Sequence, residues 1–160
     1  MSTRTTRRSF LKASGLALGA VAFSSPMLIP RGVLAQDGTP GANDRICVGY
    51  IGMGRRAHQL LNIPKDGQVI AVADVNINRA TEFAKKNEGC KPFQDYRRLL
   101  DMGEVDAVIS ATCDHWRAIT CIHAAQAKKD IYAEKPMTLT VHEGRQMVKA
   151  CRQNNVVFQT

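Results

Sequence analysis

A glycine-rich turn in the first half of the chain has the spacing that cradles a pyrophosphate. It directly follows an apolar segment and consists of Gly52, Met53, Gly54, Arg55, Arg56 and Ala57. Gly52 permits a tight turn, Gly54 lets the backbone approach the phosphates, and the small Ala57 allows a helix to pack closely on a strand. The first turn of that helix would offer unpaired N–H groups and a positive partial charge to an anion. The turn predicts a dinucleotide-binding site, with an ordinary strand-to-helix turn as the alternative.

An acidic residue follows at the distance that a dinucleotide site requires. Asp74 lies 20 residues after Gly54 and comes directly after the apolar pair Val72-Ala73. A carboxylate at the end of the second strand would bind the ribose hydroxyls of the adenosine and would repel a 2′-phosphate. Positions 75 and 76 hold no Arg that could bind such a phosphate. NAD is therefore favoured over NADP as the cofactor. The alternative role of Asp74 is to cap the next helix.

Short apolar runs alternate with helical patterns from residue 45 onward. Strands are predicted at residues 46–51, 69–73, 92–93, 105–110, 130–133 and 156–158. Helices are predicted between them, at residues 56–63, 78–86, 96–102, 116–127 and 141–153. Strands that alternate with helices of this length form βαβ units, so the fold class is α/β. We expect a doubly wound parallel sheet, a Rossmann fold, covered by helices on both faces. The predicted apolar face of the fourth helix contains Ile119, Ile122 and Ala125.

The body of the chain is nearly balanced in charge. The 160 residues include 22 Lys and Arg and 14 Asp and Glu, a formal net charge of +8. Five of the basic residues lie in the first 35 residues, which contain no acid, so residues 36–160 hold 17 basic and 14 acidic residues. This balance argues against a nucleic-acid partner, because phosphate binding needs Lys and Arg gathered on one face. A hydrophobic content of 44% with 22% charged residues is typical of a globular domain and argues against disordered, collagen-like and multi-spanning membrane proteins.

The N-terminal residues resemble a bacterial twin-arginine export signal. A charged segment, Thr6-Arg7-Arg8-Ser9-Phe10-Leu11-Lys12, precedes a moderately apolar run at residues 13–23, and Val33-Leu34-Ala35 offers small residues for cleavage. A membrane-anchoring helix is the alternative, but polar residues and prolines interrupt the run before the ~18 residues that span a bilayer. We therefore expect the twin-arginine export machinery as a partner. The location would be periplasmic or otherwise exported, after cleavage near Ala35.

The chain divides into three segments on these patterns. Residues 1–35 are expected to be the signal peptide, and residues 36–44 a linker of turn-forming and polar residues. Residues 45–160 are expected to form an NAD(P)-binding Rossmann domain. Because the chain stops at Thr160, two residues after the last predicted strand, we expect it to be cut off rather than complete.

No metal site is predicted. The cysteines have no C-x-x-C spacing, and the four histidines lack the i, i+4 spacing of a helical zinc pair. Free cysteines are usually buried, so we expect reduced, largely buried thiols. The five cysteines are Cys47, Cys90, Cys113, Cys121 and Cys151.

Two later motifs carry the most specific signal in the chain. Residues 106–118 read DAVISATCDHWRA, and the tripeptide Glu134-Lys135-Pro136 follows a predicted strand. These motifs resemble the Gfo/Idh/MocA family of NAD(P)-dependent oxidoreductases, which commonly reads D-A-V-x-I-A-T-P-D-H-W-H-A and then E-K-P in the same places. The resemblance covers residues 45–160. Cys113 replaces a proline of the pattern and Arg117 a second histidine, which predicts a less rigid loop and a more positive entrance to the site.

The resemblance implies roles for four residues. Thr112 and His115 would line the ribose and nicotinamide side of the cofactor, and Glu134 would orient the cofactor ribose. Lys135 would be the catalytic residue: it would contact cofactor and substrate hydroxyl and stabilise the charge that develops on that oxygen as hydride leaves its carbon. The Lys135–Pro136 bond is a candidate cis peptide. The alternative for Glu134 and Lys135 is a surface ion pair at the end of a strand.

The resemblance also implies an activity, the transfer of hydride between a nicotinamide cofactor and a hydroxyl-bearing carbon of a sugar, polyol or related compound. The family normally adds an α+β domain for substrate and oligomer contacts after the sixth strand. We expect this chain to lack that domain, through which any homo-oligomer would form. One alternative is a non-catalytic or truncated nucleotide-binding module. The other is an NAD-dependent glycoside hydrolase of the same superfamily, against which Lys135 counts.

Overall fold

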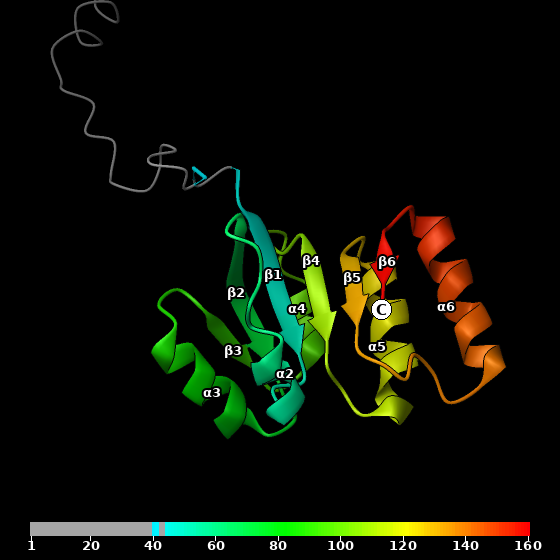
Figure 1. Ribbon diagram of the computed structural model, residues 1–160, viewed down its shortest axis with the longest axis horizontal. Coiled ribbons are helices and arrows are strands. Elements are labelled where there is room, and N and C mark those ends of the chain that lie inside the picture. Colours follow the sequence, from blue (N-terminus) through cyan, green and yellow to red (C-terminus); the bar gives the residue numbers. More distant parts are fainter. Residues whose placement is uncertain (1–39, 42–43) are drawn as a thin grey trace, which may run out of the picture.

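Six parallel strands form one sheet in the computed structural model, which describes residues 40–41 and 44–160. Their order across the sheet is β3-β2-β1-β4-β5-β6 (Figure 1). The strands are β1 (Ile46–Ile51), β2 (Gly67–Ala73), β3 (Lys91–Phe93), β4 (Ala107–Ser110), β5 (Asp130–Ala133) and β6 (Phe158–Gln159). The order reverses between β1 and β4, which confirms the predicted doubly wound α/β fold. The predicted export signal and most of the predicted linker lie outside the described residues.

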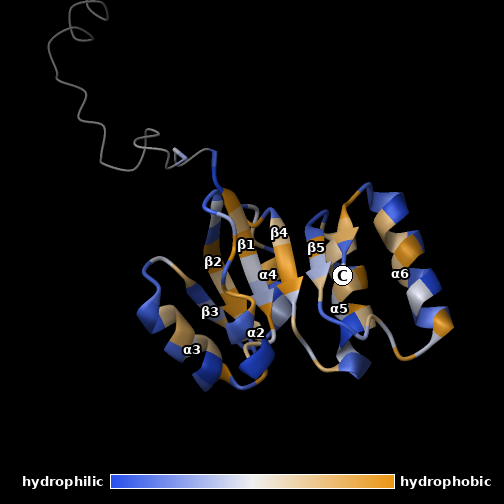
Figure 2. Ribbon diagram, viewed as in Figure 1, coloured by the Kyte–Doolittle hydropathy of each residue, from blue (hydrophilic) through white to orange (hydrophobic). Residues whose placement is uncertain are grey.

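Helices pack on both faces of this sheet through two separate hydrophobic clusters. Those in the described part of the chain are α2 (Arg55–Gln59), α3 (Ile77–Lys86), α4 (Tyr96–Leu100), α5 (Asp114–Gln126) and α6 (Val141–Asn154). α2 and α3 pack on one face of β1 and β2, whereas α4, α5 and α6 pack on the other face. Figure 2 shows apolar residues along the central strands β1, β2 and β4, and both polar and apolar residues on the helices. Each of these helices is too short or too polar to cross a membrane.

Helices cover both faces of the sheet, as predicted, but their distribution over the two faces is uneven. Right-handed crossovers place α5 and α6 on the same face of the sheet, because β4, β5 and β6 follow one another in a single direction. The opposite face of β5 and β6 carries no helix in the part of the chain that the structure describes (Figure 1).

The helix after the glycine turn is shorter than predicted. α2 ends at Gln59, and Leu60 is its C-cap. In a longer helix the Leu60 carbonyl would need the N–H of residue 64, which is Pro64 and has none. The hydroxyl of the buried Tyr50 donates to this carbonyl instead, over 2.8 Å. The chain therefore leaves the helix four residues earlier than the predicted end at Ile63.

The buried face of α5 includes the predicted Ala125, and Ile122 packs against the core, but Ile119 differs from the prediction. Ile119 is 37% exposed, whereas Ala118, Cys121, Ala124 and Ala125 are buried. These small residues lie in the same cluster as α6, so they let the two helices approach each other closely. The contact between the helices, and not the hydrophobicity of single residues, determines which side of α5 faces inward.

Candidate functional site

Gly52 and Gly54 occupy two different environments in the turn after β1. Gly52 has a φ of +87°, and a Cβ there would lie 3.0 Å from the carbonyl oxygen of Ala111. Gly54 has a φ of −81°, which any residue adopts, and a Cβ there would meet no atom within 4 Å. The fold itself therefore requires glycine at position 52. At position 54 a side chain would only fill open space in front of α2, which fits a backbone that a ligand must approach closely.

Asp74 joins the end of β2 to this turn. Its side chain is 6% exposed. One carboxylate oxygen, Oδ2, accepts a hydrogen bond of 2.8 Å from the Met53 amide, and Oδ1 accepts one of 2.8 Å from the Asn76 amide. The helix N-cap is Asn76, whose side chain accepts from the amide two residues later. Asp74 is therefore not the cap of α3, and its remaining lone pairs are available beside the glycine turn.

Arg79 is a neighbour of Asp74 that the sequence reading did not identify. Its Nη1 lies 4.0 Å from Oδ2 of Asp74, and its side chain is 58% exposed. Position 79 lies about one helical turn beyond positions 75 and 76, which directly follow the acid and hold no Arg. A search that extended over the first turn of the helix would have found it.

Glu134 forms an ion pair across the carboxyl edge of the sheet. Its Oε1 lies 2.6 Å from Nη2 of Arg56, in the first turn of α2, and its side chain is 6% exposed. The hydrogen bond from this guanidinium lowers the pKa of the Glu134 carboxyl below its ordinary value. The alternative of a surface ion pair at the end of a strand is correct only in part: Glu134 does pair directly after β5, but its partner is the half-exposed Arg56, and Glu134 itself is buried.

A cavity of about 390 Å³ brings the three sequence motifs together at the carboxyl ends of β4 and β5. From the predicted site residues it includes Arg56 of the glycine motif, Thr112 after β4, and the pair Glu134 and Lys135 after β5. Gln59, Ala111 and Arg117 complete the lining. Cavities of this size accept small polar ligands or part of a dinucleotide. The Lys135–Pro136 bond is cis, as predicted.

Several predicted residues lie outside this cavity. Met53 and Ala57 are buried beneath the turn, so Met53 can offer only its backbone, and Ala57 packs in the hydrophobic cluster with the sheet as predicted. Arg55 is exposed at the start of α2. His115 is exposed in the first turn of α5, with its ring 6.2 Å from that of Trp116, and does not line the cavity.

Arg117 has a different role from the one predicted. Its side chain is only 4% exposed, so it does not make the entrance more positive. The guanidinium donates to the carbonyl oxygens of Thr112 and Pro136, and Nη1 lies 3.5 Å from Oδ1 of Asp114. The predicted loss of rigidity in the loop after β4 is likewise not what these contacts indicate, because they hold the loop in place. The departure of position 117 from the family pattern was the only signal in the sequence.

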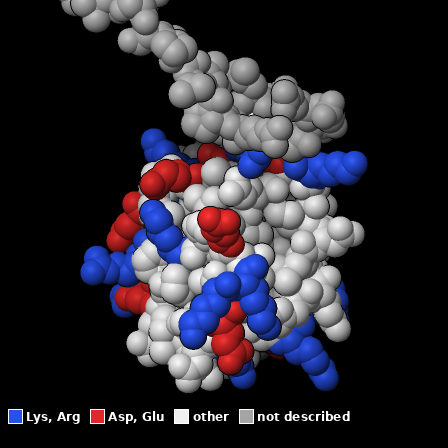
Figure 3. All heavy atoms as spheres, turned by 90° about the vertical axis from the view of Figure 1, so that its left-hand side faces the viewer, with Lys and Arg blue, Asp and Glu red and all other residues white. Residues whose placement is uncertain are grey.

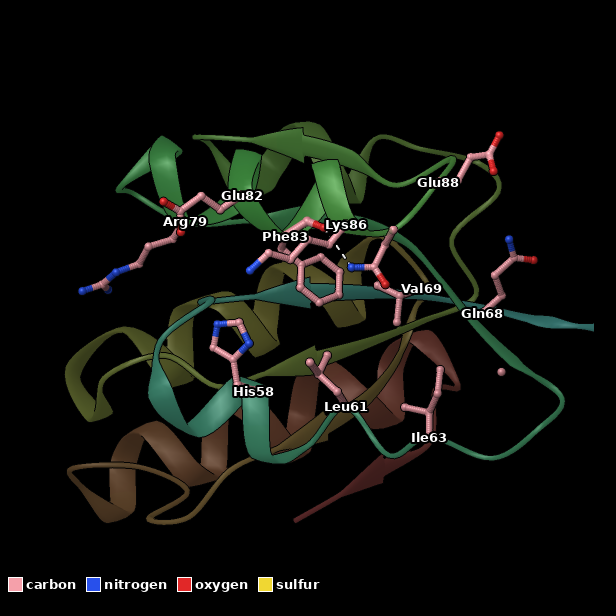
Figure 4. Close-up of a pocket in the computed structure, with 12 residues that line it drawn as sticks. His58, Leu61, Ile63, Gln68, Val69, Arg79, Glu82, Phe83, Lys86 and Glu88 are labelled. Atoms are coloured by element: carbon pink, nitrogen blue, oxygen red, sulfur yellow. Dashed lines mark hydrogen bonds between the residues drawn. The ribbon is translucent and has the colours of Figure 1, made fainter.

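A larger groove lies on the other side of α2. Its volume is about 730 Å³, and it contains none of the predicted site residues. Figure 4 shows Phe83 and His58 inside it and long charged side chains such as Arg79, Glu82 and Lys86 around it. Figure 3 shows basic and acidic residues interspersed over the face that carries α3. With both signs of charge at its rim, the groove lacks the net attraction that a pyrophosphate needs, so the smaller cavity is the better candidate.

Comparison with known proteins agrees with this geometry. Residues 46–160 match the model of an oxidoreductase family with an NAD-binding Rossmann fold. The chain belongs to this family, Gfo/Idh/MocA. Its described part is therefore a Rossmann domain of a family that binds nicotinamide cofactors.

Proteins similar to this Gfo/Idh/MocA domain act on sugars and related compounds. Myo-inositol 2-dehydrogenase of Thermotoga maritima is 28% identical over 71% of the chain and 35% of its own length. A protein of Shewanella baltica named as a member of glycosyl hydrolase family 109 is 30% identical over 89% of the chain and 36% of its own length. The crystal structure of KijD10, a 3-ketoreductase from Actinomadura kijaniata in complex with NADP and TDP-benzene, superposes with a TM-score of 0.66 and 27% identity, over 71% of this chain and 36% of that chain. The chain spans 19% to 36% of the length of the curated relatives it matches.

Proposed function

We propose that this chain is the cofactor domain of an exported oxidoreductase that moves hydride between NAD and a hydroxyl-bearing carbon of a sugar, polyol or related compound. The observation that carries the proposal is the cavity beside the glycine turn, where Thr112, Glu134 and Lys135 meet α2. It lies at the carboxyl ends of the strands, next to the point where the strand order reverses, which is where ligands of open α/β sheets bind. The similarity to myo-inositol 2-dehydrogenase and to a 3-ketoreductase supports the substrate class.

The two halves of the sheet would hold the two halves of the cofactor. The open space at Gly54 leaves room for the pyrophosphate beside the turn. Asp74, whose carboxylate already anchors the Met53 amide, would use its remaining lone pairs for the ribose hydroxyls of the adenosine. Arg79 lies 4.0 Å from Asp74 and shares its charge with that carboxylate, so a second negative group on the ribose would still meet the buried Asp74; NAD is therefore proposed over NADP. Glu134 and Thr112 would then face the nicotinamide ribose.

Lys135 would act on the substrate oxygen. Its ammonium group is exposed at the cavity, whereas the neighbouring Glu134 is already paired with Arg56. The ammonium offers three N–H donors, which can hydrogen-bond the hydroxyl and stabilise negative charge that develops on its oxygen. The bound cofactor supplies the hydride acceptor or donor.

The test is a calorimetric titration of the 160-residue chain with NAD and with NADP. We expect saturable binding of NAD and weaker binding of NADP. Asp74→Asn leaves one acceptor for two backbone amides and removes the charge, so it should weaken NAD binding roughly tenfold or more and narrow the gap to NADP. Asp66→Asn is the matched control, because the exposed Asp66 carboxylate makes no hydrogen bond within the described residues. A folded chain that binds neither nucleotide, or that binds both equally in all variants, would contradict the proposal.

Export is proposed from the sequence of residues 1–35, with residues 36–44 as the linker to the domain at 45–160. Replacing both Arg7 and Arg8 by Lys should keep the protein inside the cell, since the twin-arginine machinery recognises the pair. Arg4→Lys, outside the pair, is the control and should be exported like the unchanged chain. The measurement is the distribution of the protein between periplasmic and cytoplasmic fractions. Equal export of the double variant would disprove the twin-arginine route.

A second candidate is an NAD-dependent glycoside cleavage. The similarity to the glycosyl hydrolase family 109 protein favours it, because this match covers 89% of the chain. Lys135 argues for dehydrogenation, because the tripeptide Glu134-Lys135-Pro136 matches the pattern of the oxidoreductases of this family. The two reactions differ in their cofactor balance: cleavage leaves the amount of reduced cofactor unchanged, whereas dehydrogenation changes it in proportion to product.

A further inference from the structure

We propose that Arg117 is a positioning residue that fixes the nicotinamide half of the crevice. This inference rests on the proposed function and concerns how the same site is built. Arg117 lies in the second turn of α5, four residues after the N-cap Cys113. Its side chain is among the most deeply buried charged groups of the described domain, at 4% exposure.

The guanidinium ties together two loops from different strands. One terminal nitrogen, Nη2, donates to the carbonyl oxygen of Thr112, in the loop that follows β4. The other, Nη1, donates to the carbonyl oxygen of Pro136, in the loop that follows β5. Asp114 lies 3.5 Å from Nη1 and balances part of the positive charge. One side chain thus sets the spacing between the two loops.

These loops carry the residues that line the cavity. Thr112 contributes to it from the first loop, and Glu134 and Lys135 contribute from the second. Arg117 itself forms part of the lining behind them. A shift of either loop would therefore move a cavity-lining side chain relative to the others, although Arg117 need not touch the cofactor.

Hydrogen bonds also fix the backbone of the α5 turn that carries Arg117. Its own carbonyl accepts a hydrogen bond of 3.0 Å from the Thr120 hydroxyl. That hydroxyl also lies 3.2 Å from the hydroxyl of Ser110, at the end of β4. The helix turn that carries Arg117 is thus connected to the strand whose loop it clamps.

The chemistry of the guanidinium matches this task. Its planar fork presents several N–H donors in fixed directions, so it can serve two separate carbonyls at once, whereas a lysine ammonium is a point charge on a flexible stem. The Nε–H of Arg117 has no hydrogen-bond partner among the described residues although it is buried. Retaining a buried donor that is not fully paired is unfavourable for a group that only fills space, and is understandable for one whose terminal nitrogens set a geometry.

The location of the two carbonyls that Arg117 binds predicts a selective effect on ligand binding. The glycine turn and Asp74 belong to the half formed by β1, β2 and β3, which would hold the adenosine side. Both carbonyls that Arg117 binds belong to the half formed by β4, β5 and β6, which would hold the nicotinamide side. Loss of the clamp should therefore weaken binding of the nicotinamide half and leave the adenosine half unchanged.

The experiment titrates the full chain with NAD, nicotinamide mononucleotide and ADP by calorimetry. Arg117→Met keeps an unbranched apolar stem and removes the donors, and should weaken binding of NAD and of nicotinamide mononucleotide about tenfold while ADP binding stays within about twofold. Arg117→Lys keeps the charge and should fold, yet should also bind nicotinamide mononucleotide more weakly. Arg98→Met, which changes an exposed arginine of α4, is the control and should bind all three ligands as the unchanged chain does.

Each other outcome is decisive. An equal loss of ADP and nicotinamide mononucleotide binding would show a general structural role and overturn the inference. Nicotinamide mononucleotide binding at the wild-type level in Arg117→Lys would do the same, even if Arg117→Met fails to fold, because charge alone would then suffice. If the unchanged chain binds neither NAD nor ADP, the proposed function fails, and this inference fails with it. If the unchanged chain binds both but the Arg117 variants do not show the selective loss of nicotinamide mononucleotide binding, the proposed function stands and the role of Arg117 is overturned.

Discussion

Gly52 and Gly54 should respond in opposite ways to the addition of a single methyl group. At Gly54 a Cβ meets nothing within 4 Å and φ is −81°, so alanine fits without strain. Alanine is a poorer N-cap than glycine, which lowers stability by up to about 1 kcal/mol. Alanine also reduces the conformational entropy of the unfolded chain, which raises stability by about 0.4–1 kcal/mol. The two effects nearly cancel. Gly54→Ala should therefore leave the free energy of unfolding almost unchanged.

The same methyl group should be costly for binding. It would project into the open space in front of α2, where the pyrophosphate must approach the backbone. Loss of one charge-assisted hydrogen bond between a backbone amide and a phosphate is worth about 1.5–3 kcal/mol. NAD affinity should accordingly fall by roughly 10- to 100-fold in Gly54→Ala.

Gly52→Ala is the matched variant with the opposite profile. Its φ of +87° is unfavourable for alanine, and the new Cβ would lie 3.0 Å from the Ala111 carbonyl oxygen. Such strain costs about 1–3 kcal/mol, which lowers the melting temperature of a domain of this size by roughly 4–12 °C. Thermal unfolding followed by circular dichroism and calorimetric titration with NAD measure the two quantities. Wild-type NAD affinity in Gly54→Ala, or equal losses of stability in the two variants, would refute this assignment of the glycines.

Three further predictions concern groups whose surroundings shift a pKa or expose a thiol. At about pH 8, iodoacetamide should modify the exposed Cys113 well before Cys121. Burial raises the pKa of Cys121 to about 11, which leaves little reactive thiolate at this pH. NAD should slow only the reaction of Cys113, which follows the cavity-lining Thr112, and peptide mass spectrometry measures both rates. Burial raises the pKa of Tyr50 from 10.0 to about 12, so the stability that Tyr50 contributes is present below pH 10 and is lost as the pH rises toward 12. Tyr50→Phe should lower the free energy of unfolding, measured in urea at neutral pH, by about 1 kcal/mol. Above pH 10 the stability of this variant should fall less than that of the wild type. Arg56 lowers the pKa of Glu134, so this ion pair stabilises the fold above the ordinary carboxyl pKa of 4.5 and the stabilisation is lost as the pH falls below it. The melting temperature of Glu134→Gln should therefore fall less steeply with acid than that of the wild type, and an equally steep fall would count against this role.

Local patterns were sufficient to predict most of the elements that carry the site. β1 and β5 have the predicted ends, because each is a short apolar run bounded by turn-forming or charged residues. The positive φ of Gly52 also follows from local geometry, since a tight turn is a property of a few consecutive residues, whereas its contact with Ala111 does not. Asp74 falls at the predicted place because the spacing between two neighbouring strands is set by the helix that connects them.

Other features depend on residues that are distant in sequence. The ion pair of Arg56 with Glu134 joins positions 78 residues apart. The early end of α2 involves the hydroxyl of Tyr50, which no helix pattern contains, as well as the nearby Pro64. The charge of Arg117 alone predicts an exposed side chain at the entrance of the site. The side chain is buried instead, because two carbonyls from separate loops accept its hydrogen bonds. Such pairings arise only when the sheet brings its carboxyl ends together.

The most direct test of the account is to locate bound NAD on the chain. In an NMR titration of the isotope-labelled protein, NAD should shift the amide signals of Met53 and Gly54 in the glycine turn and of Thr112 and Lys135 at the cavity. Signals around Phe83, in the larger groove, should stay in place. Shifts confined to that groove, or no shifts at saturating NAD in a folded chain, would contradict the central claim that the dinucleotide binds across the carboxyl edge of this sheet.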